Sequence, residues 1–247
     1  MNLDITGARI YYTIPVLGGI PITESIVNGL LVTLLILGVC IFLTRDLKLR
    51  AVSTRQVIAE FIVETAVNFI ESNVGSALTH LAPIVAALFS MSIVSSLISL
   101  VGLYPPSSDL SCTLAWALVV FGVITLTKIK TNGFGGYLKG FTEPIFVFTP
   151  LNIVSEIFTP VAMAFRHFGN IMAGSVISAL VYGALAVASS ALLGILPGVL
   201  GDVLGVIPIL QVGIPAVLSI YFDLFSSFMQ AFIFCMLTVQ FVGQAAN

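Results

Sequence analysis

The last 108 residues of the chain contain a single basic residue, Arg166, in a sequence that is almost free of charge. Between residues 150 and 197, the only other ionisable groups are Glu156, His167 and Tyr182. An uncharged apolar segment of about 20 residues can cross the hydrocarbon core of a bilayer as a helix. Over the whole chain, 58% of residues are hydrophobic and 8% are charged, whereas soluble domains carry about 25% charged residues. We therefore predict an all-α integral membrane protein with about five membrane helices.

Three apolar segments, over residues 26–44, 82–104 and 110–127, precede this region and are long enough to be membrane spans. Basic residues cluster directly after the first and third segments, and cytoplasmic loops are enriched in Lys and Arg. We expect both basic loops to be cytoplasmic, and residues 1–25 and Asp109 to lie outside. A bacterial plasma membrane suits this topology, and an organellar membrane is the alternative. The clustered basic residues are Arg45, Lys48, Arg50, Arg55, Lys128, Lys130 and Lys139.

Between the first two spans, residues 53–78 alternate polar and apolar side chains at helical spacing, and Ser53 offers an N-cap. We expect an amphipathic helix at the cytoplasmic surface or against partner helices, with Glu60 and Glu64 on its solvated face. Residues 133–140 are rich in glycine and are predicted to form a turn. The first 25 residues lack the pattern of a cleavable signal, so the first span is expected to remain as an anchor.

The segment 150–241 is longer than one perpendicular span needs. About 47 helical residues, from 150 to 197, would extend about 70 Å, more than twice the thickness of the hydrocarbon core. Two perpendicular spans or one strongly tilted helix would both satisfy this length. Glycine and proline between residues 194 and 208 suggest a hairpin turn before a second long segment, at about residues 215–241.

On a helix, small or polar side chains surround Arg166. Small residues let another helix approach closely within lipid. A guanidinium stays charged in proteins, and placing it at mid-bilayer costs roughly 2.5–3.5 kcal/mol on insertion scales. We therefore favour a charge presented to a partner helix over an arginine paired with a carboxylate of its own chain. The residues on this face are Thr159, Ala162, Gly169, Asn170 and Ala173.

A second polar stripe combines Asp223, Ser226, Ser227 and Gln230 at positions i, i+3, i+4 and i+7. A carboxylate next to hydroxyls and an amide suits an ion or proton relay in a membrane. Serine and glutamine alone would more often hold two helices together. His167 points about 100° away from Arg166 on a helix, and either a proton carrier or a buried neutral histidine fits there.

Two further carboxylates are candidates for channel mouths. Glu156 lies about 15 Å before Arg166 along a helix and could line a water-filled entry or pair with a lysine. Asp109 in the outer turn could gather cations or be an ordinary loop residue. The three cysteines are far apart in sequence and form no metal-binding pattern, so no metal and no cofactor are expected.

The run from Arg166 to Gly174, Arg-His-Phe-Gly-Asn-Ile-Met-Ala-Gly, resembles the signature of subunit a of the F-type ATP synthase membrane sector. Pro150-Leu151-Asn152, Glu156 and Pro160 upstream belong to the same resemblance. Residues 230–234, Gln-Ala-Phe-Ile-Phe, are similar to the second signature of that family. The similarity extends over nearly the whole chain.

This resemblance implies a fold and a mechanism. Subunit a has one span, a surface helix, two more spans and a long tilted hairpin against a rotating ring of c subunits. Two offset aqueous half-channels carry H⁺ or Na⁺ to and from the ring, and the resulting rotation drives ATP synthesis. The implied partners are the c-subunit ring, the b subunits of the peripheral stalk, the rest of the synthase and the lipid bilayer, with no nucleic acid. The chain itself would have no catalytic site.

Four residues match positions to which the family assigns a role. Asn170 matches the asparagine one turn after the arginine, and Gln230 matches a glutamine that packs close to the arginine from the other helix. Glu156 matches an acidic position of the cytoplasmic half-channel, and Asp109 matches an acid of the outer loop. The resemblance implies that Arg166 faces the ring carboxylate and separates the two half-channels.

Three positions depart from the family pattern. Ser175 stands where the familiar bacterial members carry glutamate, and Asp223 stands where others carry histidine or glutamate. His167 replaces the usual leucine after the arginine. The outer half-channel is therefore expected to differ, with Asp223 acting alone with water. A self-contained secondary transporter that uses Arg166 as an anion site is the main alternative, and a membrane scaffold is a further one.

Overall fold

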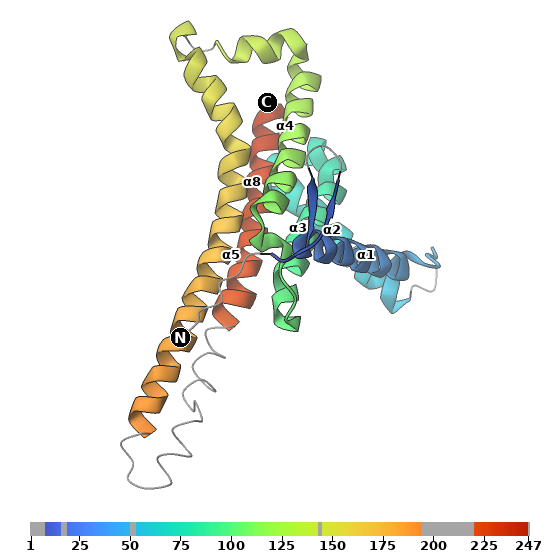
Figure 1. Cartoon of the computed structure of the whole chain (residues 1–247). Helices are drawn as coiled ribbons and strands as arrows, with labels where there is room; N and C mark the ends of the chain where they lie inside the picture. Colours follow the sequence, from blue (N-terminus) through green and yellow to red (C-terminus); the bar gives the residue numbers. More distant parts are fainter. Residues whose placement is uncertain (1–7, 16–18, 50–52, 143–144, 194–219, 247) are drawn as a thin grey trace.

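The computed structural model describes residues 8–15, 19–49, 53–142, 145–193 and 220–246 (Figure 1). Five helical segments within these residues are long and apolar enough to cross a membrane. The prediction of an all-α integral membrane fold is thereby confirmed. The segments comprise α1 (Glu24–Thr44), α3 (Ala82–Leu97) with its flanking 3-10 turns, α4 (Leu110–Gly140), α5 (Thr149–Leu193) and α8 (Ser226–Ala246).

A short β-hairpin precedes the first span. Strand β1 (Ile10–Ile14) pairs antiparallel with β2 (Ile20–Thr23), and β2 leads directly into α1. The sequence patterns above do not predict this hairpin, because a two-stranded hairpin is only marginally stable by itself. Its backbone is also bonded to the start of α1, since the Glu24 amide donates to the Arg9 carbonyl over 2.8 Å.

Helix α2 (Thr54–Val74) is the surface helix, and it begins where the serine cap was predicted. The Ser53 side chain accepts a hydrogen bond from the Gln56 amide over 3.4 Å. The helix ends at Val74 and not at residue 78, because Gly75 takes a φ of 88°. Such positive φ values are readily accessible to glycine, which is why glycine commonly ends helices. A 3-10 helix, Ser76–Leu81, then leads into α3.

Helices α3 and α4 are joined through two 3-10 turns, η2 (Ile98–Val101) and η3 (Pro106–Ser108). Helix α4 extends well beyond residue 127 and reaches Gly140, with one break at Gly133, where φ is 70°. The prediction of a turn over residues 133–140 is therefore wrong. One glycine with positive φ bends the chain, and helical structure resumes directly after it.

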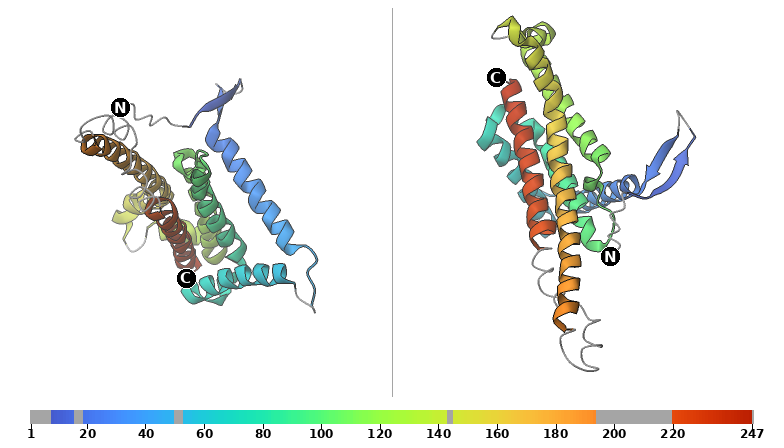
Figure 2. Two further views of the ribbon diagram at one scale, coloured as in Figure 1. Left: turned by 90° about the horizontal axis from the view of Figure 1, so that it is seen from below. Right: turned by 60° about the vertical axis from the view of Figure 1, so that its left-hand side comes forward.

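The structure decides between the two arrangements considered for residues 150–197, up to residue 193. Helix α5 is one continuous helix of 45 residues, about 67 Å long at 1.5 Å per residue. It runs beside α8, and both cross the direction of α1 at a steep angle (Figures 1 and 2). If α1 spans the bilayer along its normal, α5 and α8 are strongly tilted within it. The predicted turn near residues 194–208 lies outside the described residues.

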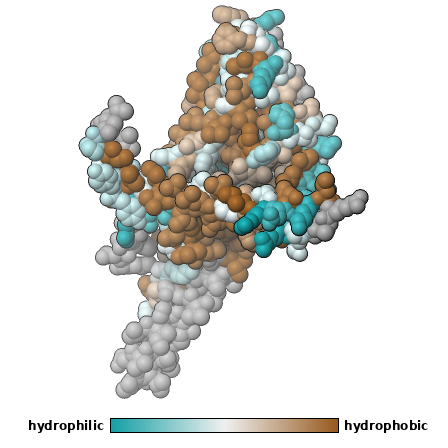
Figure 3. Space-filling view, turned by 90° about the vertical axis from the view of Figure 1, so that its right-hand side faces the viewer, coloured by the Kyte–Doolittle hydropathy of each residue, from teal (hydrophilic) through white to brown (hydrophobic). Residues whose placement is uncertain are grey.

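The core lies where α2, α3, α4, α5 and α8 meet. Its buried side chains include Ile70, Leu88, Val120, Ala164 and Phe234. Most other large apolar side chains are exposed, and the space-filling view shows broad apolar surface interrupted by hydrophilic patches (Figure 3). A soluble protein rarely exposes so large an apolar surface, whereas a membrane protein turns such side chains toward lipid.

Candidate functional site

Arg166 lies on the exposed face of α5, among small neighbours. In the described part of the chain it makes no ion pair, because the ion pairs there join Arg45 to Asp46 and Lys128 to Glu156. The alternative in which Arg166 pairs with a carboxylate of its own chain finds no support among these residues. The guanidinium is thus presented outward from a membrane helix.

The polar stripes of α5 and α8 meet one turn beyond Arg166. The Asn170 side-chain amide donates to the Ser226 hydroxyl over 2.5 Å. Ser227 is buried, and Gln230 is half-buried further along α8. Among the described residues, Gln230 has no hydrogen bond to Arg166. The structure therefore joins the two stripes through Asn170 and Ser226.

Two of the three positions that depart from the family pattern, Ser175 and Asp223, are not part of this contact. Ser175 is exposed, and its hydroxyl donates to the Met172 carbonyl of its own helix over 2.8 Å. The backbone of Asp223 lies in a π-helix, η5 (Ile220–Phe225), directly before α8. The side chain of Asp223 lies outside the part of the chain that the structure describes. Single π-helical turns occur frequently at functional sites.

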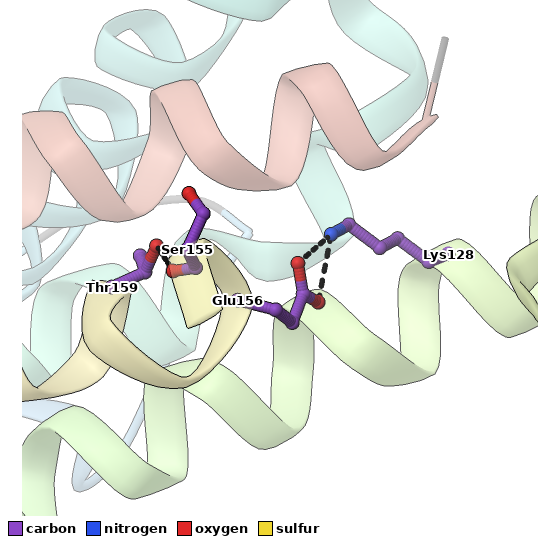
Figure 4. Close-up of polar contacts among 4 residues, drawn as sticks. All are labelled: Lys128, Ser155, Glu156 and Thr159. Carbon is purple, nitrogen blue, oxygen red and sulfur yellow. Dashed lines mark hydrogen bonds and ion pairs between the residues drawn. The ribbon is translucent and has the colours of Figure 1, made fainter. Parts of the chain in front are cut away.

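Glu156 on α5 forms an ion pair with Lys128 on α4 (Figure 4). The Lys128 Nζ atom donates to both carboxylate oxygens, over 2.8 and 2.7 Å. The lysine side chain is 29% exposed and the glutamate side chain 19% exposed. Of the two roles considered for Glu156, the structure shows the pairing with a lysine. The sequence gives no signal for this pair, since its members lie 28 residues apart on different helices.

This ion pair forms part of the wall of a polar cavity of about 360 Å³ and of an adjoining cavity of about 330 Å³. Pro160 has no amide hydrogen, so it cannot donate to the Glu156 carbonyl as a helical residue normally would. The two cavities are large enough to hold water and are lined by polar groups, as a water-filled entry requires. The other polar residues lining the two cavities are Asn132, Tyr137, Asn152, Ser155, Thr159 and Gln244.

Asp109 caps the start of α4 in the loop after α3. Its carboxylate accepts hydrogen bonds from the Ser111 amide over 2.9 Å and from the Ser25 hydroxyl over 2.5 Å. Burial raises the pKa of the nearby Tyr104, and the Asp109 carboxylate adds to this rise. Asp109 therefore ties α1 to α4 and leaves a negative charge at this end of the bundle.

His167 points into the helix bundle and not toward the exposed face of Arg166. It is 1% exposed and lies edge-on to Trp116 and Phe234, with ring centroids 5.7 and 5.8 Å away. Its Nε2 atom lies 3.3 Å from the Ser92 hydroxyl on α3. Its Nδ1 atom has no hydrogen-bond partner among the described residues. Ser92 was not among the residues that the sequence singled out.

Comparisons with known proteins point the same way as this geometry. The profile of the family described as ATP synthase A chain matches residues 26–243. An ATP synthase subunit a from Desulforamulus reducens is 31% identical over 205 residues, which are 82% of this chain and 71% of the relative. An ATP synthase subunit a 1 from Prosthecochloris aestuarii is 31% identical over 233 residues, which are 93% of this chain and 92% of the relative. A sodium ion specific ATP synthase subunit a from Propionigenium modestum is 34% identical over 137 residues, which are 56% of this chain and 39% of the relative.

Proposed function

Because the chain belongs to the ATP synthase A chain family, we propose that it supplies two aqueous half-channels and the arginine that couple cation passage to rotation of a c-subunit ring. The chain is a multi-pass membrane protein with a role in ion translocation by an F-type ATP synthase, and the rest of that complex is its partner. It contributes no catalytic site of its own and binds the b subunits of the peripheral stalk.

One observation carries the proposal: Arg166 is exposed on a membrane helix and has no ion-pair partner among the described residues. A charged group in the bilayer normally pairs with another charge or faces water. The small side chains around Arg166 leave room for a second helix to approach closely. A carboxylate carried by the c-subunit ring is therefore the partner that this surface fits best.

The electrostatics of such a pair give the coupling. A guanidinium close to a carboxylate favours its ionised form, so a ring carboxylate that arrives at Arg166 releases its bound cation. Once it has moved on and bound another cation, it is neutral and can rotate through lipid at a lower cost. Each monovalent cation that crosses the full potential supplies about 2.3 kcal/mol per 100 mV. The fixed positive charge also keeps cations from passing directly between the half-channels.

The cavities at Lys128 and Glu156 support an inner half-channel at this end of α5. Lys128 belongs to one of the two basic clusters, which supports assigning this end to the cytoplasmic side of a bacterial plasma membrane. The contact between Asn170 and Ser226 lies between the inner cavities and Ser175 along α5. Ser175 and Asp223 are assigned to the outer half-channel, and Ser227 and Gln230 to the polar stripe of α8 that lines the ion path near Arg166. The coupling ion is H⁺ or Na⁺, and one relative is named sodium ion specific.

ATP-driven ion pumping by the purified complex in liposomes tests the proposal. The Arg166→Ala variant should assemble and hydrolyse ATP but build no ion gradient. Arg45→Ala, which removes an exposed arginine whose ion-pair partner among the described residues is its neighbour Asp46, is the matched control and should pump normally. Normal pumping by Arg166→Ala would show that this arginine is structural. A self-contained transporter would instead move its substrate without a c-subunit ring.

A further inference from the structure

An apolar groove lies between α2, α3 and α8, and it shares no lining residue with the two polar cavities. Its volume is about 380 Å³, and five phenylalanines contribute to its wall. Phe69 lies edge-on to Phe232, and Phe89 lies edge-on to Phe228, with ring centroids 5.8 Å apart in each pair. Phe61, Phe228 and Phe232 are nevertheless exposed. The groove thus offers hydrocarbon surface that the described residues leave uncovered.

The two hydroxyls in the wall of this groove already have hydrogen-bond partners. The Thr65 hydroxyl donates to the Phe61 carbonyl over 2.7 Å, and the Ser90 hydroxyl donates to the Ala86 carbonyl, each within its own helix. No lining residue among those described carries a charge. A polar ligand group would therefore lose its hydrogen bonds to water without gaining others, which is costly. The groove is suited to hydrocarbon, such as the acyl chain of a lipid.

The face of α2 that lines the groove begins with a cation. Arg55 shares a sector of about 60° with three groove residues, Ile62, Ala66 and Phe69. It is exposed, and it precedes Ile62 by about 10 Å of helix. Its guanidinium lies over the Phe42 ring of α1, 4.3 Å from the ring centroid. Among the described residues Arg55 forms no ion pair, so its N–H groups are open to an anion.

A second cation is held beside the first turn of α2. The buried Gln56 side chain accepts a hydrogen bond from the Lys48 amide and donates one to the Lys48 carbonyl, each over 3.0 Å. The Lys48 side chain is exposed and has no ion-pair partner in the described ranges. The Glu60 carboxylate, which accepts from the Gln56 amide over 2.7 Å, lies about 140° around α2 from Arg55. Lys48 and Arg55 therefore form a cationic corner where α1 meets α2.

The cationic corner and the groove are spaced like the two parts of a phospholipid. Helix α1 diverges from the bundle toward its C-terminal end, and α2 runs back from there to α3 and α8 (Figure 2). The side of the molecule that carries α1 and α2 shows hydrophilic atoms directly beside a broad apolar surface (Figure 3). Acyl chains of one leaflet reach about 15 Å, half of the hydrocarbon core. This reach covers the distance of about 10 Å from Arg55 to Ile62 in the groove.

We propose that this surface binds one anionic phospholipid, whose phosphate contacts Lys48 and Arg55 and whose acyl chain fills the groove. The site goes beyond ion translocation and uses none of the residues assigned to it. Arginine binds phosphate oxygens through two parallel hydrogen bonds, and basic residues next to a membrane span favour anionic lipids. A partner helix could cover the groove, but it would bring no phosphate to the cationic corner. The bound lipid ties the α1–α2 corner to α8.

Photoreactive lipids test the site in the purified complex, reconstituted into phosphatidylcholine vesicles. One probe is phosphatidylglycerol with a photoreactive group in its acyl chain, and the other is phosphatidylcholine with the same group. After illumination, the groove-lining peptides of α2 and α8 should carry several-fold more label from the anionic probe. Excess glycerol phosphate in the buffer should leave this labelling unchanged, because the acyl chain contributes to binding. If glycerol phosphate abolishes the labelling, the corner is a site for free phosphate and the proposal is wrong.

Variants of the cationic corner test the role of its charges. Lys48→Gln combined with Arg55→Gln should reduce labelling by the anionic probe to the level of the zwitterionic probe. Lys139→Gln, which removes an exposed lysine near the end of α4, is the matched control and should label like the wild type. Equal labelling of the wild type by the two probes would overturn the proposal without any variant. A groove that takes up no label, or that cross-links to a partner helix instead, would also overturn it.

Discussion

Reversing the charges of Lys128 and Glu156 tests the inner cavity most directly. The variants are Lys128→Glu, Glu156→Lys and the double exchange, which restores opposite charges with their positions swapped. Each single exchange places two like charges where the structure has contacts of 2.7 and 2.8 Å. The double exchange keeps the pair and moves the carboxylate from α5 to α4.

The magnitude follows from the partial burial of the pair. Unit charges about 4 Å apart attract by about 4 kcal/mol at an effective dielectric constant of 20. Desolvation and side-chain ordering offset part of this attraction, and hydrogen bonds between charged groups contribute about 1.5–3 kcal/mol net. With side chains 29% and 19% exposed, the repelled groups can also turn toward the cavity. We therefore expect each single exchange to destabilise the α4–α5 contact by about 3 kcal/mol.

Two measurements on the purified complex separate packing from ion translocation. The fraction of this chain that stays in the complex across a urea series should fall in both single variants and recover in the double exchange. ATP-driven pumping should stay low in the double exchange, because the carboxylate no longer projects from α5. If the loss of retention in the double exchange equals the sum of the losses in the two single variants, the two side chains are not coupled. If the double exchange pumps normally, the position of the carboxylate is immaterial and the proposed role of Glu156 is wrong.

Three further predictions concern packing and caps. Gly243→Ala should weaken the α2–α8 contact by about 1–3 kcal/mol, because the added Cβ would overlap the Cγ1 methyl of Val74. Val74→Ala in the same chain removes that methyl and should restore complex retention in urea. Asp109→Ala should cost about 1 kcal/mol by removing the α4 cap, whereas Asp109→Asn should preserve most of the stability in the same assay. Asn170→Ala and Ser226→Ala should each impair pumping, and a double variant no worse than either alone would show that they act through their shared hydrogen bond.

Much of the fold can be predicted because membrane insertion depends on local composition. The apolar runs that become α1, α3 and α4 are visible in the sequence, since each must satisfy its backbone hydrogen bonds internally as a helix. The helix cap at Ser53 and the family signature that begins at Arg166 can also be predicted, because each depends only on neighbouring residues. The helix ends are less visible, since a glycine can end a helix, as Gly75 does, or only bend it, as Gly133 does.

The sequence by itself determined that this chain is a membrane protein and to which family it belongs, because hydropathy and a signature are properties of contiguous residues. The number of spans between residues 150 and 197 was left open, and the single helix α5 decided it. Only the tertiary structure decided which polar groups meet. Lys128 contacts Glu156 from 28 residues away, and Ser92 contacts His167 from 75 residues away. These contacts depend on how separate helices pack, and helix packing is a property of the assembled bundle that no single segment encodes.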